Sequence, residues 1–454
     1  MNYQETLNFL FTRRASHYKD LRRMRYLLDR LDNPQNTFPA VLITGTNGKG
    51  AVAKILSHVL TAAGFRTGCF TSPHLVDFRE RITIDQQQIA EADVVRLTEQ
   101  VVTQALDPFE REQKQLGIEG IAAFFELTTA LAYLYFAAQQ IDLAVLEVGI
   151  GGRLDATNTC NPLVSVITNV GIDHQNLLGD TIEAIAREKA AIIRENGDVV
   201  VGCQTFDSLA VIKEVCRQKS ARLHRAGVQQ KPGTFTVSSV IPNRLLQTGT
   251  TFSYHGFHTF YEELSMPLIG EHQLANAAIA LVTIEVLGQK GFTAGKQAIR
   301  DGLAGISHHG RLETVADRPR IVVDIAHNGM GASATASTLS TVFEYQKLVL
   351  VIGVLHDKDV RGILRPFLEM TDSVVFTSPS NTSRANNAAK TASIAAEILC
   401  QADRHVSEFQ HWLVCESVAE AIEQARTLAG EDDLICVTGS SYTVSEAVIC
   451  IQGM

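Results

Sequence analysis

The chain has 454 residues, an apolar content of 45%, a charged content of 20% and a net charge of −9. This length exceeds that of a typical single core, so we expect two globular domains. The composition is that of a soluble protein. The negative balance argues against broad surfaces for nucleic acid or anionic membrane, although a local basic pocket stays open.

No targeting or membrane pattern is evident. No apolar run reaches the roughly 18 residues of a membrane span, and the first residues lack the layout of a secretory signal. The eight cysteines are scattered without a C-x-x-C pair. Reduced thiols in a cytoplasmic protein explain this pattern better than a disulfide framework or a zinc site.

Short apolar runs alternate with helical patterns through the first 230 residues. The runs are AVLIT, RTGCFTS, DLAVLEVG, LVSVITNVG and DVVVG, at residues 40–44, 66–72, 142–149, 163–171 and 198–202. Helices are expected at about 51–64, 124–140 and 180–195. This alternation predicts an α/β fold, with a mostly parallel sheet covered by helices on both faces.

The pattern changes between residues 234 and 269, where TFTVSSV, TTFSYHG and FHTFYEELSM suggest hairpin strands added at a sheet edge. The following stretch, GEHQLANAAIALVTIEVL, returns to a helical pattern. The first domain is therefore expected to cover residues 1–300.

A domain junction is predicted in DGLAGISHHGRLETVADRP, which holds three glycines and a proline. Beyond it, apolar strands in RIVVDIAHN, KLVLVIGVLHDKD, SVVFTSPS and DLICVTGSSYT each end in polar residues. We predict a linker at residues 301–312, a hinge near 298–312, and a smaller Rossmann-like α/β domain at 313–454.

The stretch VLITGTNGKGAVAKIL, residues 41–56, joins an apolar strand to a helix through a glycine-rich turn. Such a turn lets backbone N–H groups surround an anion, the helix dipole adds to it, and Lys49 can reach a nucleotide phosphate. The P-loop match is imperfect, because Ile43 replaces the first glycine, Gly50 follows the lysine, and Ala51 replaces a hydroxyl. A plain strand-to-helix turn is the alternative.

Other strand ends carry polar residues suited to a nucleotide site. Glu147 ends one strand, Asp173 and His174 follow another, and Ser72 and His74 follow a third. Ligands of open α/β sheets bind at the carboxyl ends of strands, so Glu147 could hold nucleotide-bound Mg²⁺. The alternatives are an acid that merely ends a strand and an ordinary loop histidine. Several such features together favour the site.

Longer motifs extend over nearly the whole chain. They are NPQNTFPAVLITGTNGKG, TSPHLVDFRERI, FFELTTALAYLYF, LEVGIGGRLDATN, GIDHQNLLGDTIEAIAREKAAII, GEHQLANAA, GRLE, DIAHN and GVLHDKD. With them the chain resembles the folylpolyglutamate synthase/dihydrofolate synthase family of the Mur-ligase superfamily. TSPHLVDFRERI and GRLDATN match this branch and argue against a cell-wall Mur ligase.

The resemblance implies an ATP-dependent ligase that joins L-glutamate to a folate-type carboxylate, either dihydropteroate, folyl-glutamates or both. The γ-phosphoryl group of ATP would convert the carboxylate into an acyl phosphate, and the glutamate amine would then displace phosphate. Two domains closing over the substrates would exclude water. ATP is the implied co-substrate, with Mg²⁺ at two sites; K⁺ stays open as an activating ion. A monomer acting on small molecules only, with no nucleic acid or membrane, is expected.

The same resemblance implies roles for individual residues. The ATP-binding positions would be Gly45, Thr46, Asn47, Gly48, Lys49, Gly50, Asn276, Arg311 and Asp324. One Mg²⁺ would be held by Ser72 and Glu147, and a second by His174 and a carbamylated Lys189. Substrates would meet His74, Arg81, Arg153, Asp155, His327 and Ser440. The catalytic set would be Lys49, His174, Lys189, Arg311 and His327.

Some positions depart from the family pattern or have a plainer interpretation. Ala51 stands in place of Ser or Thr, Gly329 replaces the proline of D-x-A-H-N-P, and two histidines precede Gly310. Without the resemblance, Lys189 would be taken as a surface lysine in an i, i+4 or i, i+3 charge pattern. Two alternatives stay open: a relative that ligates another carboxylic acid, and a nucleotide-binding protein that has lost catalysis. Retention of residues with implied roles argues against the second: Lys49, Glu147, His174, Lys189, Arg311 and Asp324.

Overall fold

The computed structural model describes residues 1–13, 20–202, 205–229 and 238–453. They divide into two compact units. The first unit comprises Met1–Pro242, Phe252–Ser265 and Leu274–Ile306, and the second comprises Asn243–Thr251, Met266–Gln273 and Ser307–Met454. Across the described ranges, no helix is long and apolar enough to cross a membrane.

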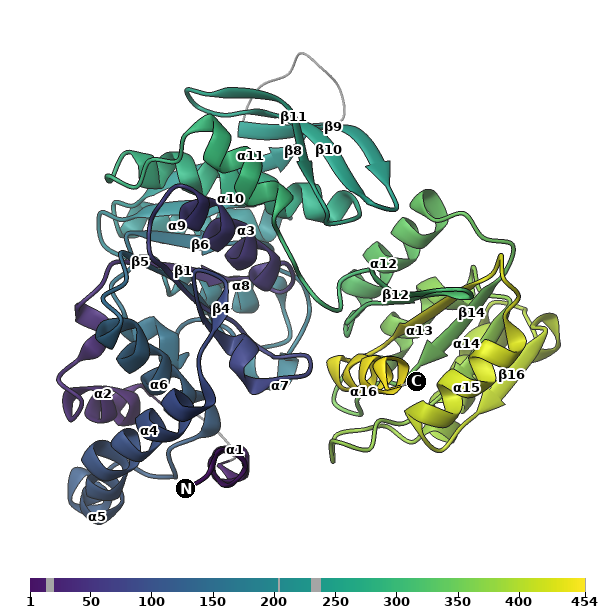
Figure 1. Cartoon of the computed structure of the whole chain (residues 1–454), viewed down its shortest axis with the longest axis horizontal. Helices are drawn as coiled ribbons and strands as arrows, with labels where there is room; N and C mark the ends of the chain where they lie inside the picture. Colours follow the sequence, from purple (N-terminus) through teal and green to yellow (C-terminus); the bar gives the residue numbers. More distant parts are fainter. Residues whose placement is uncertain (14–19, 203–204, 230–237, 454) are drawn as a thin grey trace. The chain divides into compact units, whose positions relative to one another are not determined.

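The larger sheet contains eleven strands in the described residues, ordered β11-β10-β9-β8-β7-β6-β1-β5-β2-β3-β4 (Figure 1). The strands are β1 (Ala40–Thr44), β2 (Thr67–Phe70), β3 (Ile82–Ile84), β4 (Gln87–Gln88), β5 (Leu143–Glu147), β6 (Val164–Ile167), β7 (Asp198–Val201), β8 (Arg222–Val228), β9 (Ser238–Leu246), β10 (Gly249–His255) and β11 (Phe260–Met266). Neighbouring strands from β8 to β2 are parallel, whereas β3 and β4 pair antiparallel at one edge. The carboxyl ends of β1, β5 and β6 therefore meet at one edge of the sheet.

Helices cover this sheet, and several begin at a polar cap. They are α1 (Tyr3–Thr12), α2 (Arg22–Asp29), α3 (Lys49–Ala62), α4 (Glu91–Val101), α5 (Asp107–Leu116), α6 (Phe124–Ala138), α7 (Gln175–Leu178), α8 (Ile182–Ala190), α9 (Phe206–Gln218), α10 (Glu271–Gly288) and α11 (Lys296–Ala304). Asn2 and Glu5 form a capping box at α1, and Thr181 caps α8 through the Ala184 N–H. Such caps satisfy the N–H groups that have no partner inside the helix.

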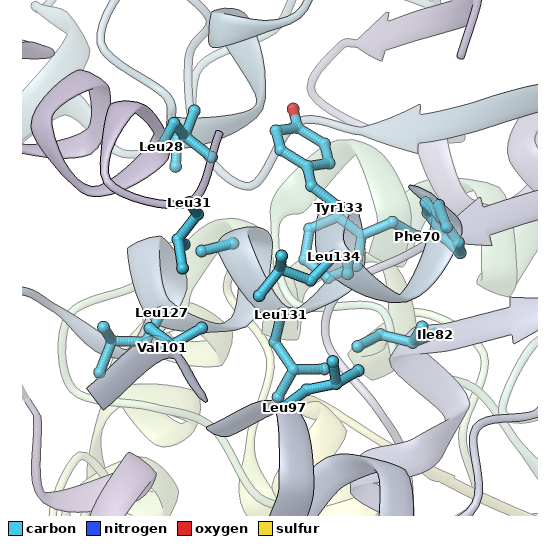
Figure 2. Packing of buried hydrophobic residues seen from close by; sticks show 14 of the residues in the cluster. Leu28, Leu31, Phe70, Ile82, Leu97, Val101, Leu127, Leu131, Tyr133 and Leu134 are labelled. Carbon is cyan, nitrogen blue, oxygen red and sulfur yellow. The ribbon is translucent and has the colours of Figure 1, made fainter. Parts of the chain in front are cut away.

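The main core of the first unit lies between the sheet and α2, α4 and α6. Leu28, Leu97 and Leu131 come from these three helices and are at most 1% exposed (Figure 2). Alternate residues of β1 face this core, because side chains of a strand point to opposite faces of a sheet. Tyr133 brings a polar atom into the core, and its hydroxyl donates to the Thr157 carbonyl at 3.0 Å.

The second unit contains a sheet of six strands in the described residues, ordered β12-β13-β17-β14-β15-β16. The strands are β12 (Glu313–Asp317), β13 (Arg320–Val323), β14 (Leu348–Ile352), β15 (Ser373–Phe376), β16 (His411–Val414) and β17 (Leu434–Thr438). All pairs are parallel except β12 with β13. Its helices are α12 (Gly329–Val342), α13 (Val360–Leu368), α14 (Ala388–Gln401), α15 (Val418–Leu428) and α16 (Ser441–Gln452).

The predicted fold class is confirmed: a larger, mostly parallel sheet carries edge strands β9 to β11, and a smaller α/β sheet follows in the chain. Element ends differ from the prediction. Helix α3 begins at Lys49, not Ala51, and α8 ends at Ala190, not near Glu195. The first predicted edge strand began at residue 234, and residues 234–237 lie outside the described ranges.

The predicted junction starts inside a helix. Residues 301–304 belong to α11, which packs against α3. A Cβ at Gly302 would lie 2.5 Å from the Val59 Cα, so this glycine permits close helix packing. Gly302 is therefore a poor pivot, and a Gly302→Pro variant would test helix packing instead of a hinge.

Candidate active site

The glycine-rich turn between β1 and α3 has the geometry of a phosphate loop. Gly48 adopts a left-handed conformation, with φ of 84°, and caps α3. A Cβ at Gly48 would lie 2.2 Å from Asn276 Oδ1, so Asn276 of α10 lies against the loop. The Lys49 ammonium group donates to the carbonyls of Gly45 and Thr46 at 3.1 and 3.3 Å. Lys49 thus lies over its own loop.

Glu147 lies one strand away from this loop. It ends β5, opposite Ile43 of β1, and is only 3% exposed. Its Oε2 accepts the Ser72 N–H at 2.9 Å, which brings Ser72 beside the carboxylate. Glu147 supplies a buried carboxylate, and Ser72 carries a hydroxyl; both groups are hard oxygen donors, the type that Mg²⁺ prefers. The donor set therefore fits a magnesium ion that also takes oxygens from outside the protein.

His174 and Lys189 come from two further elements of the same unit. His174 caps α7 in a left-handed conformation, with φ of 52°, and its Nε2 lies 3.9 Å from Asp173 Oδ2. Lys189, in the last turn of α8, is 3% exposed. The interpretation of Lys189 as a surface lysine is therefore wrong. No cluster of three or more His, Cys, Asp or Glu side chains suited to a metal occurs among the described residues.

The electrostatic surroundings of Lys189 favour a neutral amine. Burial, reinforced by the charge of Lys49, lowers the pKa of the Lys189 amine to about 7, although Asp173 and Asp155 act in the opposite direction. Lys49 and Asp173 therefore both lie within electrostatic reach of Lys189. The structure thus brings Lys49 and Lys189 near each other, and it places Glu147 in the strand next to the one that leads into the glycine loop.

Asp155 and Arg153 have protein partners in this structure. The Asp155 carboxylate accepts the N–H groups of Gly149 and Ile150 at 3.0 and 3.1 Å, and both the N–H and the hydroxyl of Thr157. Burial raises the pKa of Asp155, although these hydrogen bonds oppose the rise. Asp155 thus shapes the turn after β5. The Arg153 side chain is 56% exposed, and its Nε bonds Glu188 at 2.9 Å.

His74 and Arg81 form a pair in an aromatic setting. Arg81, in the 3-10 turn η2 (Phe78–Arg81), donates from Nε to His74 Nδ1 at 2.7 Å. Burial, and then the Arg81 charge, lowers the pKa of His74 to about 3. The Phe11 and Phe124 rings lie 5.4 Å apart, and the Arg81 guanidinium lies 5.1 Å from the Phe124 ring. Sequence reasoning missed Phe11 and Phe124, because an aromatic residue in an apolar helix is ordinarily a core residue.

The second unit contains the remaining predicted residues. The buried Asp324 carboxylate accepts the N–H groups of Leu312 and Ala326 at 3.0 and 2.9 Å, and the Thr335 hydroxyl at 2.8 Å. Burial lowers the pKa of His272; the Asp324 charge opposes this shift and the Arg311 charge adds to it. Arg311 and Asp324 thus lie within electrostatic reach of the same imidazole, a residue that sequence reasoning missed.

His327 lies in the loop between β13 and α12, and Ser440 lies at the start of α16. His327 Nδ1 lies 2.9 Å from the Ile325 carbonyl. Ser440 is fully buried and caps α16, accepting the Thr443 N–H at 3.1 Å. Their predicted roles toward the amino acid stay predictions.

Two departures from the family pattern have a packing context. Ala51 is 3% exposed in the first turn of α3. Gly329 is the first residue of α12, which Asn328 caps. A Cβ at Gly329 would lie 3.3 Å from the Gly362 carbonyl, so α12 and α13 approach closely there. The absence of a side chain at Gly329 therefore suits the packing of these helices.

Two family models match this chain. Residues 43–284 match the family "Mur ligase middle domain", and residues 310–441 match "Mur ligase, glutamate ligase domain". A dihydrofolate synthase/folylpolyglutamate synthase of Mycobacterium tuberculosis is 36% identical over 453 residues, which cover 94% of this chain and 89% of the relative.

Solved structures are similar over the whole length. The M. tuberculosis folylpolyglutamate synthase complexed with ADP and AMPPCP has a TM-score of 0.87 and 33% identity, with 99% of this chain and 98% of that chain covered. The E. coli FolC in complex with DHPP and ADP has a TM-score of 0.83 and 28% identity, with 100% and 98% covered.

Proposed function

The chain belongs to the folylpolyglutamate synthase/dihydrofolate synthase family of Mur ligases and is an ATP-dependent ligase; we propose that it joins L-glutamate to dihydropteroate, to folyl-glutamates or to both. One observation carries the assignment of the site: a glycine loop with its lysine lies one strand away from a buried carboxylate. The similar structures bind ADP, AMPPCP and DHPP, which supports nucleotide and folate-type substrates here.

The phosphate loop binds the ATP phosphates. Its N–H groups and the N-terminus of α3 face an anion favourably, and Lys49 spreads the negative charge that develops during phosphoryl transfer. Asn276 lies against Gly48 and contacts the nucleotide from α10. Arg311 and Asp324 keep their proposed role toward ATP.

Ser72 and Glu147 would hold a magnesium ion, because Glu147 is a buried carboxylate and Ser72, whose N–H it accepts, carries a hydroxyl. When bound, the ion supplies positive charge that neutralises the transferring phosphoryl group. Glu147 also keeps Ser72 in place through the 2.9 Å bond to its N–H. An activating role for K⁺ stays a proposal that only an activity assay in different salts can test.

Lys189 is carbamylated and, with His174, would hold a second magnesium ion. The amine nitrogen must be neutral to attack CO₂. The N–C bond forms as one C=O π bond opens and places the negative charge on oxygen, and the nitrogen then loses one proton to solvent. Burial of Lys189 favours the neutral amine that this step needs. The product is an anion, which suits a position near the Lys49 charge.

The acid and the amino acid meet different residues. The flat ring system of the acid lies near His74 and Arg81, where aromatic rings offer stacking surfaces. Arg153 and Asp155 contribute to the same region, Asp155 by shaping the turn after β5. The amino acid contacts His327 and Ser440 of the second unit, and Ser440 lies at the start of α16.

The test is a phosphate-release assay with ATP, L-glutamate and a panel of acids: dihydropteroate, tetrahydrofolate and unrelated carboxylic acids. Release is expected with dihydropteroate, with tetrahydrofolate or with both. Enzyme, ATP and glutamate without an acid should release little phosphate, because glutamate acts as the nucleophile. Rapid release under that condition, or turnover only with an unrelated acid, would contradict the proposal.

A relative that ligates another carboxylic acid is the second candidate. The departures at Ala51, at Gly329 and at the two histidines before Gly310 motivate it; Gly329 begins α12 two residues after the predicted amino-acid-side residue His327. The close approach to Gly362 gives Gly329 a packing reason and weakens that argument. The acid panel separates the two candidates.

The oligomeric state and the cellular location of the protein are further proposals. A monomer follows from the small-molecule chemistry, which needs only the one chain, and size-exclusion chromatography with light scattering tests it. A cytoplasmic location rests on the scattered cysteines of the sequence and is tested by cell fractionation.

A further inference from the structure

The phosphate loop runs beside the segment that follows β6. Strands β1 and β6 are parallel neighbours, with Thr44 opposite Ile167. The Thr168 N–H donates to the Thr44 carbonyl at 2.9 Å, so the ladder continues past the end of β6. The loop and residues 168–171 therefore leave the sheet together.

Thr168 and Asn169 hold both polar groups of the Asn47 backbone. The Asn47 N–H donates to Asn169 Oδ1 at 2.9 Å, and the Asn47 carbonyl accepts the Thr168 hydroxyl at 2.6 Å. Asn47 directly precedes the left-handed Gly48 and the lysine of the loop. The orientation of the Asn47 backbone therefore sets the direction in which the chain enters α3.

Thr46 makes three further hydrogen bonds to the same segment. Its N–H donates to the Asn169 carbonyl at 3.0 Å. Its hydroxyl donates to the Gly171 carbonyl at 3.1 Å and accepts the Gly171 N–H at 2.9 Å. Thr46 is 7% exposed and Thr168 is 1% exposed. Hydrogen bonds between buried groups are costly to leave unmade, so these bonds hold the loop in one conformation.

The approach of the two segments is also sterically close. A Cβ at Gly45 would lie 1.8 Å from the Thr168 hydroxyl oxygen, so only glycine fits there. The same segment reaches Asp173 and His174 within three residues of Gly171. The loop is thus tied to the part of the chain that carries a proposed metal ligand.

We propose that Thr168 and Asn169 are positioning residues for the ligase reaction: they fix the Asn47 backbone and thereby hold Lys49 and the loop in register with ATP. This inference rests on the proposed function of the loop. A displacement of about 1 Å in a reacting group can cost roughly 100-fold in rate. Hydrogen bonds to both the N–H and the carbonyl of Asn47 prevent such a displacement of the loop.

The first test compares Thr168→Val, which keeps the shape and removes the hydroxyl, with Thr168→Ser, which keeps the hydroxyl. The matched control is Thr283→Val, because Thr283 is fully buried in α10 and its hydroxyl bonds the Ile279 carbonyl at 2.7 Å. Thr168→Val should lower kcat/KM for ATP by roughly 10- to 100-fold and leave KM for glutamate unchanged. Thr168→Ser should restore most of the loss, and Thr283→Val should leave kcat/KM for ATP unchanged.

The second test needs neither ATP nor turnover. In Asn169→Ala, the Asn47 N–H loses its acceptor, so hydrogen exchange at this amide should accelerate by about tenfold or more relative to wild type. The β5 amides should exchange at the wild-type rate, which shows that the effect is local. Unchanged exchange at Asn47 would overturn the inference.

The outcomes separate this inference from the proposed function. If Lys49→Ala abolishes turnover while Thr168→Val and Asn169→Ala keep kcat/KM for ATP within twofold of wild type, only the positioning role fails. Losses equal to that of Thr283→Val would also overturn it. If Lys49→Ala turns over ATP normally, the loop is not the nucleotide site and the proposed function itself fails.

Discussion

Ala51 and Glu147 bear on metal binding in different ways. Mg²⁺ prefers six oxygens and readily keeps water, so solvent can replace the hydroxyl that Ala51 lacks. Glu147 supplies a buried negative charge beside Ser72, which water cannot replace. We expect Ala51→Ser to change kcat by less than roughly tenfold, or about 1.4 kcal/mol. Glu147→Gln should lower kcat by more than roughly 100-fold, and added Mg²⁺ should restore it only in part.

Steady-state assays at several Mg²⁺ concentrations measure this ordering, and Glu285→Gln is the control for removal of a carboxylate. Glu285 also accepts hydrogen bonds inside the first unit, from Tyr254 and the Phe257 N–H at 2.9 Å. A gain of orders of magnitude in Ala51→Ser would mark the natural protein as a weakened ligase. A harmless Glu147→Gln would place the metal elsewhere.

Lys189 makes the activity depend on pH and on CO₂. With a pKa of about 7, roughly half of the amine is neutral at pH 7, whereas an ordinary lysine is almost fully protonated. A fall in pH from 8 to 6 protonates the amine and removes the form that reacts with CO₂. We therefore expect activity to fall over this range and to rise again when bicarbonate is added at constant pH.

A ¹³C NMR spectrum with labelled bicarbonate checks the same prediction directly. A carbamate signal should be present in wild type and absent in Lys189→Ala. Lys290→Ala serves as the control, because the Lys290 ammonium group is paired with Asp198 at 2.7 Å and lies outside this set of residues. Full activity in CO₂-free buffer, together with no carbamate signal, would show that Lys189 works as an amine.

At the scale of elements, the end of α8 packs directly on the turn after β5. A Cβ at Gly152 would lie 2.8 Å from the Glu188 carbonyl and 3.1 Å from the Lys189 carbonyl. In Gly152→Ala, the last turn of α8 must move and take Lys189 with it. We expect a stability loss of about 1–3 kcal/mol and a loss of ligation of more than roughly tenfold.

Thermal unfolding and ligation assays on the same preparation measure the two effects. Gly288→Ala is the matched control, because a Cβ there would meet no atom within 4 Å; it should unfold at or above the wild-type temperature. If Gly152→Ala retains full ligation, the turn and α8 are not coupled through this contact.

Strands that are mostly apolar were predictable from the sequence. β1, β5 and β14 are fully buried runs of five residues. The strands β3, β4, β8, β12 and β16 were missed, because short or partly polar strands lack a clear apolar pattern. The end of α8 was placed too late. The N–H groups of Ile192 and Ile193 donate to the Lys189 and Ala190 carbonyls, three residues back, so the α-helical pattern has ended there.

The candidate site also contains features that the sequence predicts and features that it does not. The glycine turn with Lys49 and the acid Glu147 at a strand end are local patterns, so the sequence sufficed to find them. The ties from Thr168 and Asn169 to Asn47 join residues 121 and 122 positions apart. They depend on β6 lying beside β1, which no local pattern specifies. An Asn after a strand reads only as a turn residue.

For the whole molecule, the division into two units changes the expected hinge. The first unit ends at Ile306 and the second resumes at Ser307, after α11. Asn243–Thr251 and Met266–Gln273 are also grouped with the second unit. A rigid-body motion at the linker alone would therefore separate these segments from the unit with which they group, or bend β9 to β11.

We expect the two units to move on substrate binding, because an acyl phosphate must be kept from water. Small-angle scattering curves of the protein alone and with a non-hydrolysable ATP analogue plus acid should differ. Ser307→Pro restricts the exposed backbone at the unit boundary, so it should lower kcat with little change in unfolding temperature. Gly302→Ala should instead lower the unfolding temperature, since it crowds Val59 of α3. Superimposable scattering curves, together with full activity in Ser307→Pro, would mean that the active arrangement exists before the substrates bind.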